Sequence, residues 1–228
     1  MPKKTKAIKL TDRNKAWLRK AKPSVYEIES RETNKIILIV CEGQTEKLYF
    51  ESFPVLTLTV EAIDLRGQSK LKLIEVTEAI VKNSTKDYDK IWCVFDMDLR
   101  QGEKEFADFD NAIKSGISKK YEIAYSNDAF ELWFYLHYNF SEQRNHRQFY
   151  YKALSSLWNC NYEKEGKVYN FSKSIFNRLE KDTNASQQKA IERAKNLFDK
   201  QSDLNYHEQN PVTMVYELVK ILNSNSRR

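Results

Sequence analysis

The stretch IWCVFDMD, Ile91–Asp98, decides how the rest of the chain is interpreted. An uninterrupted apolar run such as Ile91–Phe95 is typical of a strand that is buried on both faces of a sheet. The run ends abruptly in two carboxylates, Asp96 and Asp98, one residue apart. A buried strand has no structural use for two acids at its tip, because charged side chains are costly to bury unless they are paired or functional.

The segments around this strand alternate between strand-like and helical patterns. Lys35–Cys41 is a second apolar run, and Glu42–Gly43 forms its exit. Further strands are expected at 58–65 and 121–126, and helices within 42–53, 69–83, 103–116 and 128–138. Gly116 is expected to close the third helix, and Asn127 or Asp128 to cap the fourth. This rhythm predicts an α/β fold with a mostly parallel sheet flanked by helices and with right-handed crossovers.

The alternation stops at residue 141, which suggests three regions. Residues 1–34 form a basic N-terminal arm, 35–140 the α/β core, and 141–228 a mainly helical C-terminal extension packed on the core. Within the extension, apolar spacing predicts helices at about 147–158, 185–200 and 211–223. The segment Asn159–Asn170 reads as a loop or a small hairpin.

Charge is distributed unevenly along the chain. Met1–Lys22 contains nine basic residues and one acidic residue, so this segment carries +8, and the remainder sums to −2 against a total of +6. A basic arm on a near-neutral body is attracted to polyanions, and Lys3, Lys4 and Arg13 are its candidate contacts to nucleic acid. The alternative is a solvated tail that only keeps the protein soluble.

Composition excludes several classes of protein. No apolar run approaches about 18 residues, which a membrane-spanning helix needs, and the basic N-terminus lacks the apolar core of a signal peptide. Cys41, Cys93 and Cys160 are too widely spaced for a metal-binding set and are expected to be reduced. A cytoplasmic protein is therefore expected.

The acids at two strand ends suggest a metal site. Ligands bind beyond the carboxyl ends of parallel strands, so Glu42, Asp96 and Asp98 would meet at one edge if their strands are neighbours. Glu46 follows Glu42 at a spacing of four residues and can share its face of the helix. Clustered carboxylates suit Mg²⁺ or Mn²⁺, which assist phosphoryl transfer. The alternatives are acids that favour a helix dipole at 42 and 46, and a turn or cap at 96 and 98.

Four motifs resemble the RloB-like family, which comprises bacterial proteins linked to phage defence and often encoded beside an ATPase partner. The motifs are ILIVCEGQTEKLYFESF, VFDMD, SNDAFELWFYLHY and QNPVTMVYELV. The resemblance extends from about Lys35 to Leu222. It implies a core similar to Toprim domains, which have a Glu after the first strand and an Asp-x-Asp after a later one.

The Toprim pattern maps onto Glu42, Asp96 and Asp98, and Glu46 matches a second Glu of the OLD-type nucleases. The resemblance thus implies a metal-dependent nuclease acting on DNA or RNA in phage defence and abortive infection. The chain has no G-x-x-x-x-G-K-[ST] motif, so any ATP dependence has to come from a partner protein. The sequence is compatible with a homo-oligomer.

Other polar residues near the expected sheet edge are further candidates. Glu131 lies on a strongly apolar helix, where it could bind or orient the metal, or pair with an arginine. Lys47, Arg66 and Lys70 are placed to hold backbone phosphates, unless they are ordinary surface charges. His207 is the histidine best placed to contact a phosphate, although a structural role is the simpler alternative.

Two other functions fit parts of the pattern. A non-catalytic Toprim-like module could bind nucleic acid or dock on an ATPase. A phosphatase of the haloacid-dehalogenase kind also carries Asp-x-Asp, with Asp96 as its nucleophile. In that class the motif follows the first strand, and Leu99–Arg100 fits its continuation poorly.

Overall fold

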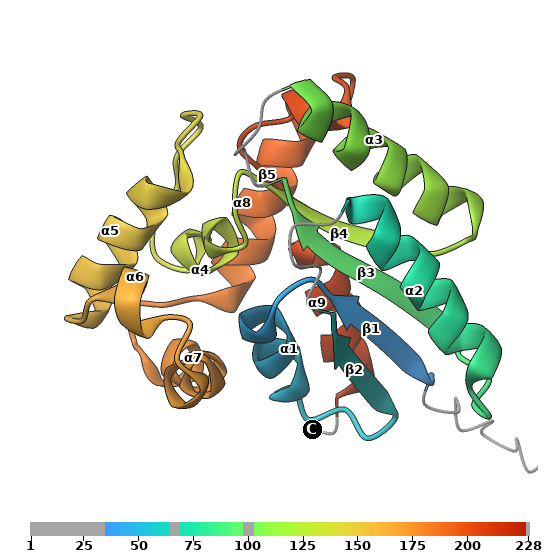
Figure 1. Cartoon of the computed structure of the whole chain (residues 1–228). Helices are drawn as coiled ribbons and strands as arrows, with labels where there is room; N and C mark the ends of the chain where they lie inside the picture. The colour runs from blue at the N-terminus through green and yellow to red at the C-terminus, as the bar shows by residue number, and fades with distance from the viewer. Residues whose placement is uncertain (1–34, 64–68, 98–102, 227–228) are drawn as a thin grey trace, which may run out of the picture. The chain divides into compact units, whose positions relative to one another are not determined.

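The computed structural model describes residues 35–63, 69–97 and 103–226. The basic arm expected at 1–34 lies outside the described residues. In the described part, one sheet has five strands in the order β2-β1-β3-β4-β5 (Figure 1). Its first four strands are parallel, and β5 runs antiparallel to β4. The strands are β1 (Ile37–Cys41), β2 (Leu58–Ala62), β3 (Lys90–Asp96), β4 (Glu122–Asn127) and β5 (Val212–Thr213). The mostly parallel α/β sheet predicted from the sequence is confirmed.

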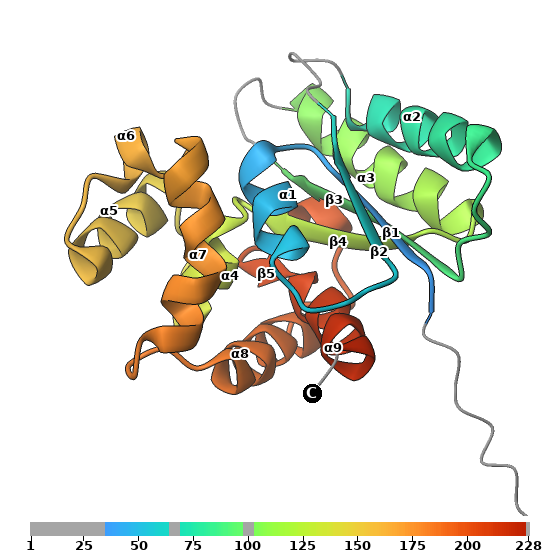
Figure 2. The same cartoon turned by 90° about the horizontal axis from the view of Figure 1, so that it is seen from below.

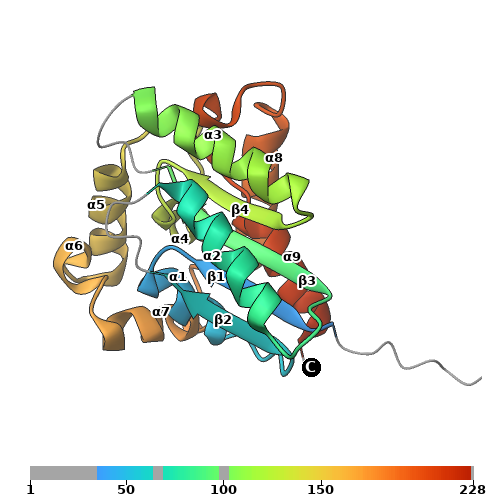
Figure 3. The same cartoon turned by 45° about the vertical axis from the view of Figure 1, so that its right-hand side comes forward.

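Helices cover both faces of this sheet. α2 and α3 lie on one face, and α1, α4 and α9 lie on the other, which is clear when Figures 2 and 3 are compared. The remaining helices follow α4 in the chain. The helices are α1 (Gln44–Glu51), α2 (Lys70–Asn83), α3 (Glu103–Ser118), α4 (Glu131–Leu136), α5 (Arg147–Trp158), α6 (Tyr162–Glu165), α7 (Tyr169–Lys181), α8 (Gln187–Asp199), the 3-10 turn η3 (Tyr206–Glu208) and α9 (Val215–Asn225).

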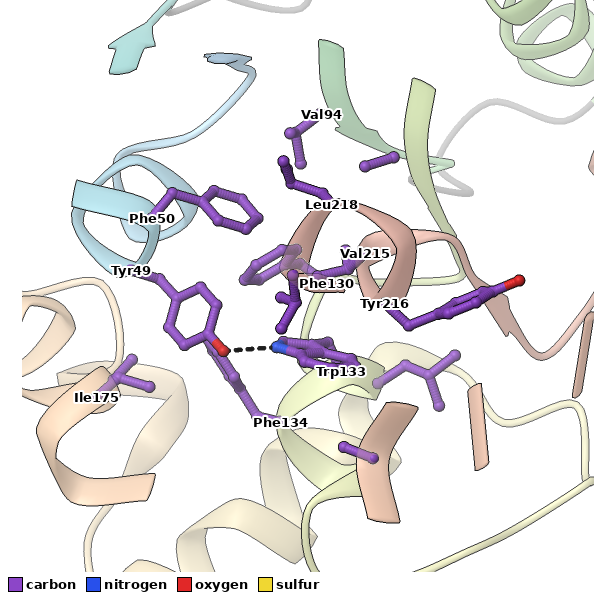
Figure 4. Close-up of a cluster of buried hydrophobic side chains, with 14 of the residues drawn as sticks. Tyr49, Phe50, Val94, Phe130, Trp133, Phe134, Ile175, Val215, Tyr216 and Leu218 are labelled. Atoms are coloured by element: carbon purple, nitrogen blue, oxygen red, sulfur yellow. Dashed lines mark hydrogen bonds between the residues drawn. The ribbon is translucent and has the colours of Figure 1, made fainter. Parts of the chain in front are cut away.

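The core has two halves because successive strand residues point to opposite faces. Ile37 and Ile39 of β1 pack with α1, α4 and α9, whereas Leu38 and Val40 pack with α2 and α3. Every residue of β1 is buried, as its continuous apolar run predicted. In the first half, the Nε1–H of Trp133 donates to the hydroxyl of Tyr49 at 2.8 Å, deep among aromatic rings (Figure 4).

The C-terminal region differs from the sequence prediction. The loop or hairpin expected at 159–170 is wrong, because this segment contains α6 and the start of α7. The helix expected from about 211 begins at Val215, since Val212–Thr213 pairs with β4 as an edge strand. The chain thus returns to complete the sheet, and α9 then buries its apolar side against the core.

Two predicted helix ends were also wrong. α3 continues past Gly116 to Ser118, and the left-handed turn comes at Lys120, whose φ is 64°. Asn127 and Asp128 do not cap α4, because β4 extends through Asn127 and Phe130 is the residue before the helix. Tertiary contacts use these two polar side chains elsewhere. In the parts of residues 35–226 that are described, no helix combines the length and apolar character needed to cross a membrane.

Candidate active site

The site lies at the carboxyl edge of the parallel strands. β1 is hydrogen-bonded directly to β3, so the residues that end these strands are neighbours in space. Glu42 follows β1, and its backbone N–H donates to the carbonyl of Val94 in β3 at 2.9 Å. Asp96 is the last residue of β3. The strand adjacency on which the sequence argument depended is therefore present.

A cavity of about 310 Å³ opens at this edge. It is bordered by β1, β3, the first turns of α1, α4 and α5, and the turn between α6 and α7. Its charged wall residues are acids from the core and two cations from the C-terminal region. These residues are Glu42, Glu46, Asp96, Glu131, Arg147 and Lys167. The cavity therefore joins four carboxylates from three separate parts of the sequence.

The first turn of α1 folds closely around Glu46. The carboxylate of Glu46 lies directly over the backbone of Gly43, where a Cβ atom would collide with it. Glycine at this position leaves room for the carboxylate to lie against the backbone. Glu42 and Glu46 thus approach the same cavity from one short segment.

Burial and mutual repulsion disfavour ionisation of these acids. Burial raises the pKa of Glu46 to about 7, and Glu131 and Glu42 add to the rise, while a hydrogen bond from its own backbone N–H and Lys167 oppose it. Burial also raises the pKa of Asp96 well above its ordinary range, with Glu46 and Glu131 contributing. The pKa of Glu131 is raised mainly by burial. A cation in the cavity would relieve this repulsion.

One oxygen of this group lacks a partner. Asp96 Oδ1 is buried and accepts no hydrogen bond from any described residue. A hard carboxylate oxygen with a free lone pair, on a residue that lines a cavity with other carboxylates, is the type of donor that Mg²⁺ and Mn²⁺ use. Within the described ranges, however, no group of three His, Cys, Asp or Glu side chains is arranged to bind a metal ion. The carboxylate oxygens of the cavity are donors that suit Mg²⁺ or Mn²⁺. Their side chains would have to move closer together to bind such an ion.

Glu42 is engaged by a lysine instead. The Nζ of Lys70, at the start of α2, donates to both carboxylate oxygens of Glu42 at 2.5 and 2.6 Å. The backbone N–H of Lys70 donates to Asp108 Oδ2 at 2.6 Å, which anchors the lysine to α3. Lys70 was expected to hold a phosphate, and in this structure it neutralises the first acid of the site.

Glu131 is held by a tyrosine from the C-terminal region. The hydroxyl of Tyr162 in α6 donates to Glu131 Oε1 at 3.2 Å, and both side chains are buried. Gly166 ends α6 so close to Tyr162 that a Cβ atom would strike the tyrosine's carbonyl oxygen and ring. The short α6 therefore holds the hydroxyl of Tyr162 against Glu131, which lines the cavity.

Sequence reasoning missed the cations of the cavity. Arg147 begins α5, and its backbone N–H donates to Asp128 Oδ2 at 2.9 Å. Lys167 lies in the turn between α6 and α7. Only the tripeptide Glu165–Lys167 hinted at a tight turn, and no local pattern connected either cation with β1 or β3.

The other predicted contacts lie elsewhere. Lys47 donates to the carbonyl of Val60 at 2.6 Å and pairs with Glu51, so it ties α1 to β2. His207 bonds Asp110 through its backbone N–H and its ring Nδ1, both at 2.9 Å. Neither residue borders the cavity. The remaining candidates, Asp98, Arg66, Lys3, Lys4 and Arg13, lie outside the described residues.

Comparison with known proteins decides the family. The chain matches the family described as RloB-like protein over residues 37–222, which is most of its length. The chain belongs to the RloB-like family. The match spans the sheet, the cavity and the helices α5–α7, so this RloB-like region includes both the acids and the cations described above. Searches among curated proteins and among solved structures return no match.

Proposed function

We propose that this RloB-like protein is a divalent-metal-dependent nuclease that hydrolyses phosphodiester bonds in DNA or RNA. The observation that carries the proposal is the convergence of Glu42, Glu46, Asp96 and Glu131 on one cavity. Raised pKa values of Glu46 and Asp96 support a cation as the missing partner, because the acids repel one another without it. Asp98 is proposed as a further ligand on sequence grounds alone.

Mg²⁺ or Mn²⁺ bound by these carboxylates would supply Lewis-acid stabilisation of the charge on the phosphodiester oxygens. Asp96 supports this assignment best, because its Oδ1 has no protein donor among the described residues. Glu42 can join the ligand set once it leaves Lys70. The ammonium group of Lys70 can then bind a substrate phosphate, which is the role that the sequence predicted for this lysine.

The chain's own residues have distinct parts in the proposed reaction. Glu46 lies at the cavity beside the other acids, where it can complete the ligand set or position the attacking water. Arg147 and Lys167 bring positive charge to the cavity beside the acids and offset the charge of the phosphate. Tyr162 positions Glu131 through its hydrogen bond. Oxygen from water bonds to phosphorus, and the bond to the leaving oxygen breaks with its electron pair.

The biological setting is also a proposal. The family resemblance suggests a cytoplasmic protein that acts in phage defence, together with an ATPase partner. The chain has no nucleotide-binding loop of the Walker type, which supports a separate source of ATP hydrolysis. Nucleic acid, bound by the basic arm, is the proposed substrate, and a homo-oligomer remains part of the proposal.

Cleavage assays test the proposal. Wild type, Asp96→Asn and Glu42→Gln are incubated with labelled single-stranded and duplex DNA and RNA, with Mg²⁺, Mn²⁺ or EDTA, alone and with the co-encoded ATPase. We expect metal-dependent cleavage that falls at least about 100-fold in both variants, because each loses a ligand charge. Glu75→Gln, an exposed acid on α2, is the matched control and should cleave like wild type. Equal cleavage, or equal absence of cleavage, in all four proteins would refute the proposed catalysis.

A non-catalytic binding module is the second candidate. The ion pair between Lys70 and Glu42 favours it, because this lysine already satisfies an acid that a nuclease needs for metal. Such a module would bind nucleic acid equally well in wild type and Glu42→Gln and would cleave in neither.

A further inference from the structure

A second cavity lies beside the first. Its volume is about 390 Å³, and it lies between α5 and α6. Its wall is about equally polar and apolar, and it includes amide, hydroxyl and ammonium groups. The polar side chains of the wall are Gln148, Tyr151, Lys152, Ser155, Asn161 and Glu163. Tyr151 borders both cavities, so the two adjoin at this residue.

One face of α5 connects the two cavities. Arg147 and Tyr151, one turn apart, border the first, and Gln148, Tyr151, Lys152 and Ser155 border the second. The opposite face of the helix is apolar and buried through Tyr150, Leu154 and Trp158. The polar face therefore runs from the carboxylates to the second cavity, so a ligand that contacts both would extend along the helix.

The second cavity has the chemistry of a nucleotide subsite. An aromatic ring at its border can stack on a base, and amide and carboxylate groups can bond a base edge. Gln148 offers a donor and an acceptor, and Glu163 accepts from amino groups. Asn161 offers only its amide N–H groups, because its Oδ1 accepts from the backbone N–H of Lys164 at 3.2 Å and caps α6. Lys152 is exposed and offers the charge that a backbone phosphate requires.

We propose that a single-stranded polynucleotide lies along α5, with one phosphodiester at the carboxylates and the neighbouring base in the second cavity. This inference rests on the proposed function for the phosphodiester and adds the substrate class. A base that occupies the second cavity has turned away from any complementary strand. In a duplex the bases are stacked and paired inside the helix, so they cannot enter it without unpairing.

The geometry of the first cavity supports the same substrate class. Its acids are recessed, because Glu131 is only 8% exposed and Asp96 Oδ1 is fully buried. A flexible single strand can bend to bring a phosphate to them. The helices α5, α6 and α7 stand together to one side of the sheet (Figure 1).

Binding of oligonucleotides tests the inference without cleavage. The full-length protein carries Asp96→Asn, and fluorescence anisotropy in Mg²⁺ compares a labelled single-stranded 12-nucleotide probe with the same strand in a duplex. We expect tighter binding of the single strand. Adding Lys152→Glu or Tyr151→Ala should weaken it about tenfold, from lost phosphate contact or lost stacking. Lys173→Glu reverses an exposed charge on α7, next to neither cavity, and should have little effect.

Two results would overturn the subsite. One is equal affinity for single strand and duplex, and the other is an equal loss from Lys152→Glu and Lys173→Glu. Cleavage assays with an intact Asp96 separate this failure from failure of the proposed function. Metal-dependent cleavage that is unchanged by Lys152→Glu refutes the subsite and leaves the nuclease standing. Specific loss of single-strand binding in a protein that never cleaves supports the subsite and refutes the nuclease.

Discussion

The ammonium group of Lys70 bridges both carboxylate oxygens of Glu42, at 2.5 and 2.6 Å. Both side chains are largely buried, with exposed fractions of 11% and 26%. A lysine thereby occupies the position at Glu42 that the proposed function assigns to a divalent cation. Metal binding and this ion pair should therefore compete.

Replacing Lys70 by methionine should strengthen metal binding. Lys70→Met keeps the apolar stem of the side chain and removes the competing charge, so we expect Mn²⁺ to bind about tenfold more tightly, equivalent to ~1.4 kcal/mol. Isothermal titration calorimetry measures the affinity. Lys72→Met is the control, because Lys72 pairs with Glu75 at the exposed surface of the same helix. Weaker Mn²⁺ binding by Lys70→Met would show that the lysine supports the site rather than blocking it.

Metal affinity should also depend on pH through Glu46. Its pKa of about 7 means that the carboxyl group holds a proton below neutrality, and a metal has to displace that proton. Mn²⁺ affinity should therefore rise between pH 6 and pH 8. Titrations with Mn²⁺ at several pH values measure how the affinity changes with pH in wild type and in Glu46→Gln, whose side chain has no proton to lose. A wild-type affinity that is flat over this range would remove Glu46 from the ligand set.

Tyr49 should stabilise the core through its hydroxyl. It accepts the hydrogen bond of Trp133 Nε1–H at 2.8 Å, and both side chains are buried (Figure 4). Tyr49→Phe leaves a buried donor without an acceptor, so the free energy of unfolding should fall by about 1–3 kcal/mol. Urea denaturation measures it. Tyr169→Phe, at an exposed position, should have no effect, and a matching loss there would show that the assay does not report this bond.

His137 should make the fold sensitive to acid. Burial lowers its pKa to about 4, and Arg193 adds to the fall, while the bond from its ring Nδ1 to the carbonyl of Trp133 opposes it. Between pH 6.5 and about 4 the unfolded chain binds a proton that the folded protein does not. The free energy of unfolding should therefore decrease as pH falls through this window, by ~3 kcal/mol from this residue.

Denaturation of wild type and His137→Gln at pH 7 and pH 4.5 checks the assignment. The variant retains the acids of the site, so the difference between the two proteins isolates the histidine. The difference in the free energy of unfolding between wild type and His137→Gln should become smaller toward low pH. A gap that stays constant would mean that His137 is protonated in the folded protein.

The first four strands and the acids at the ends of two of them were readable from the sequence, whereas the order of the strands was not. Lys35–Cys41 and Lys90–Asp96 are apolar runs that end in acid, and the parallel sheet makes them neighbours. Such patterns are local, because a strand buried on both faces needs apolar residues at successive positions. The same reasoning failed at 159–170, where α6 is a single turn and its few residues carry no helical period.

The sequence by itself determined the α/β class and placed Glu42, Glu46 and Asp96 at or just beyond the carboxyl ends of strands, since strand periodicity and the rule for parallel sheets are enough for both. The tertiary structure decided that β1 lies next to β3, which brings these acids together. Only the tertiary structure decided that Arg147, Tyr162 and Lys167 face those acids, that Lys70 is paired with Glu42, and that a second cavity adjoins the first. The physical reason is that side-chain packing between helices depends on contacts remote in sequence, which no local periodicity encodes.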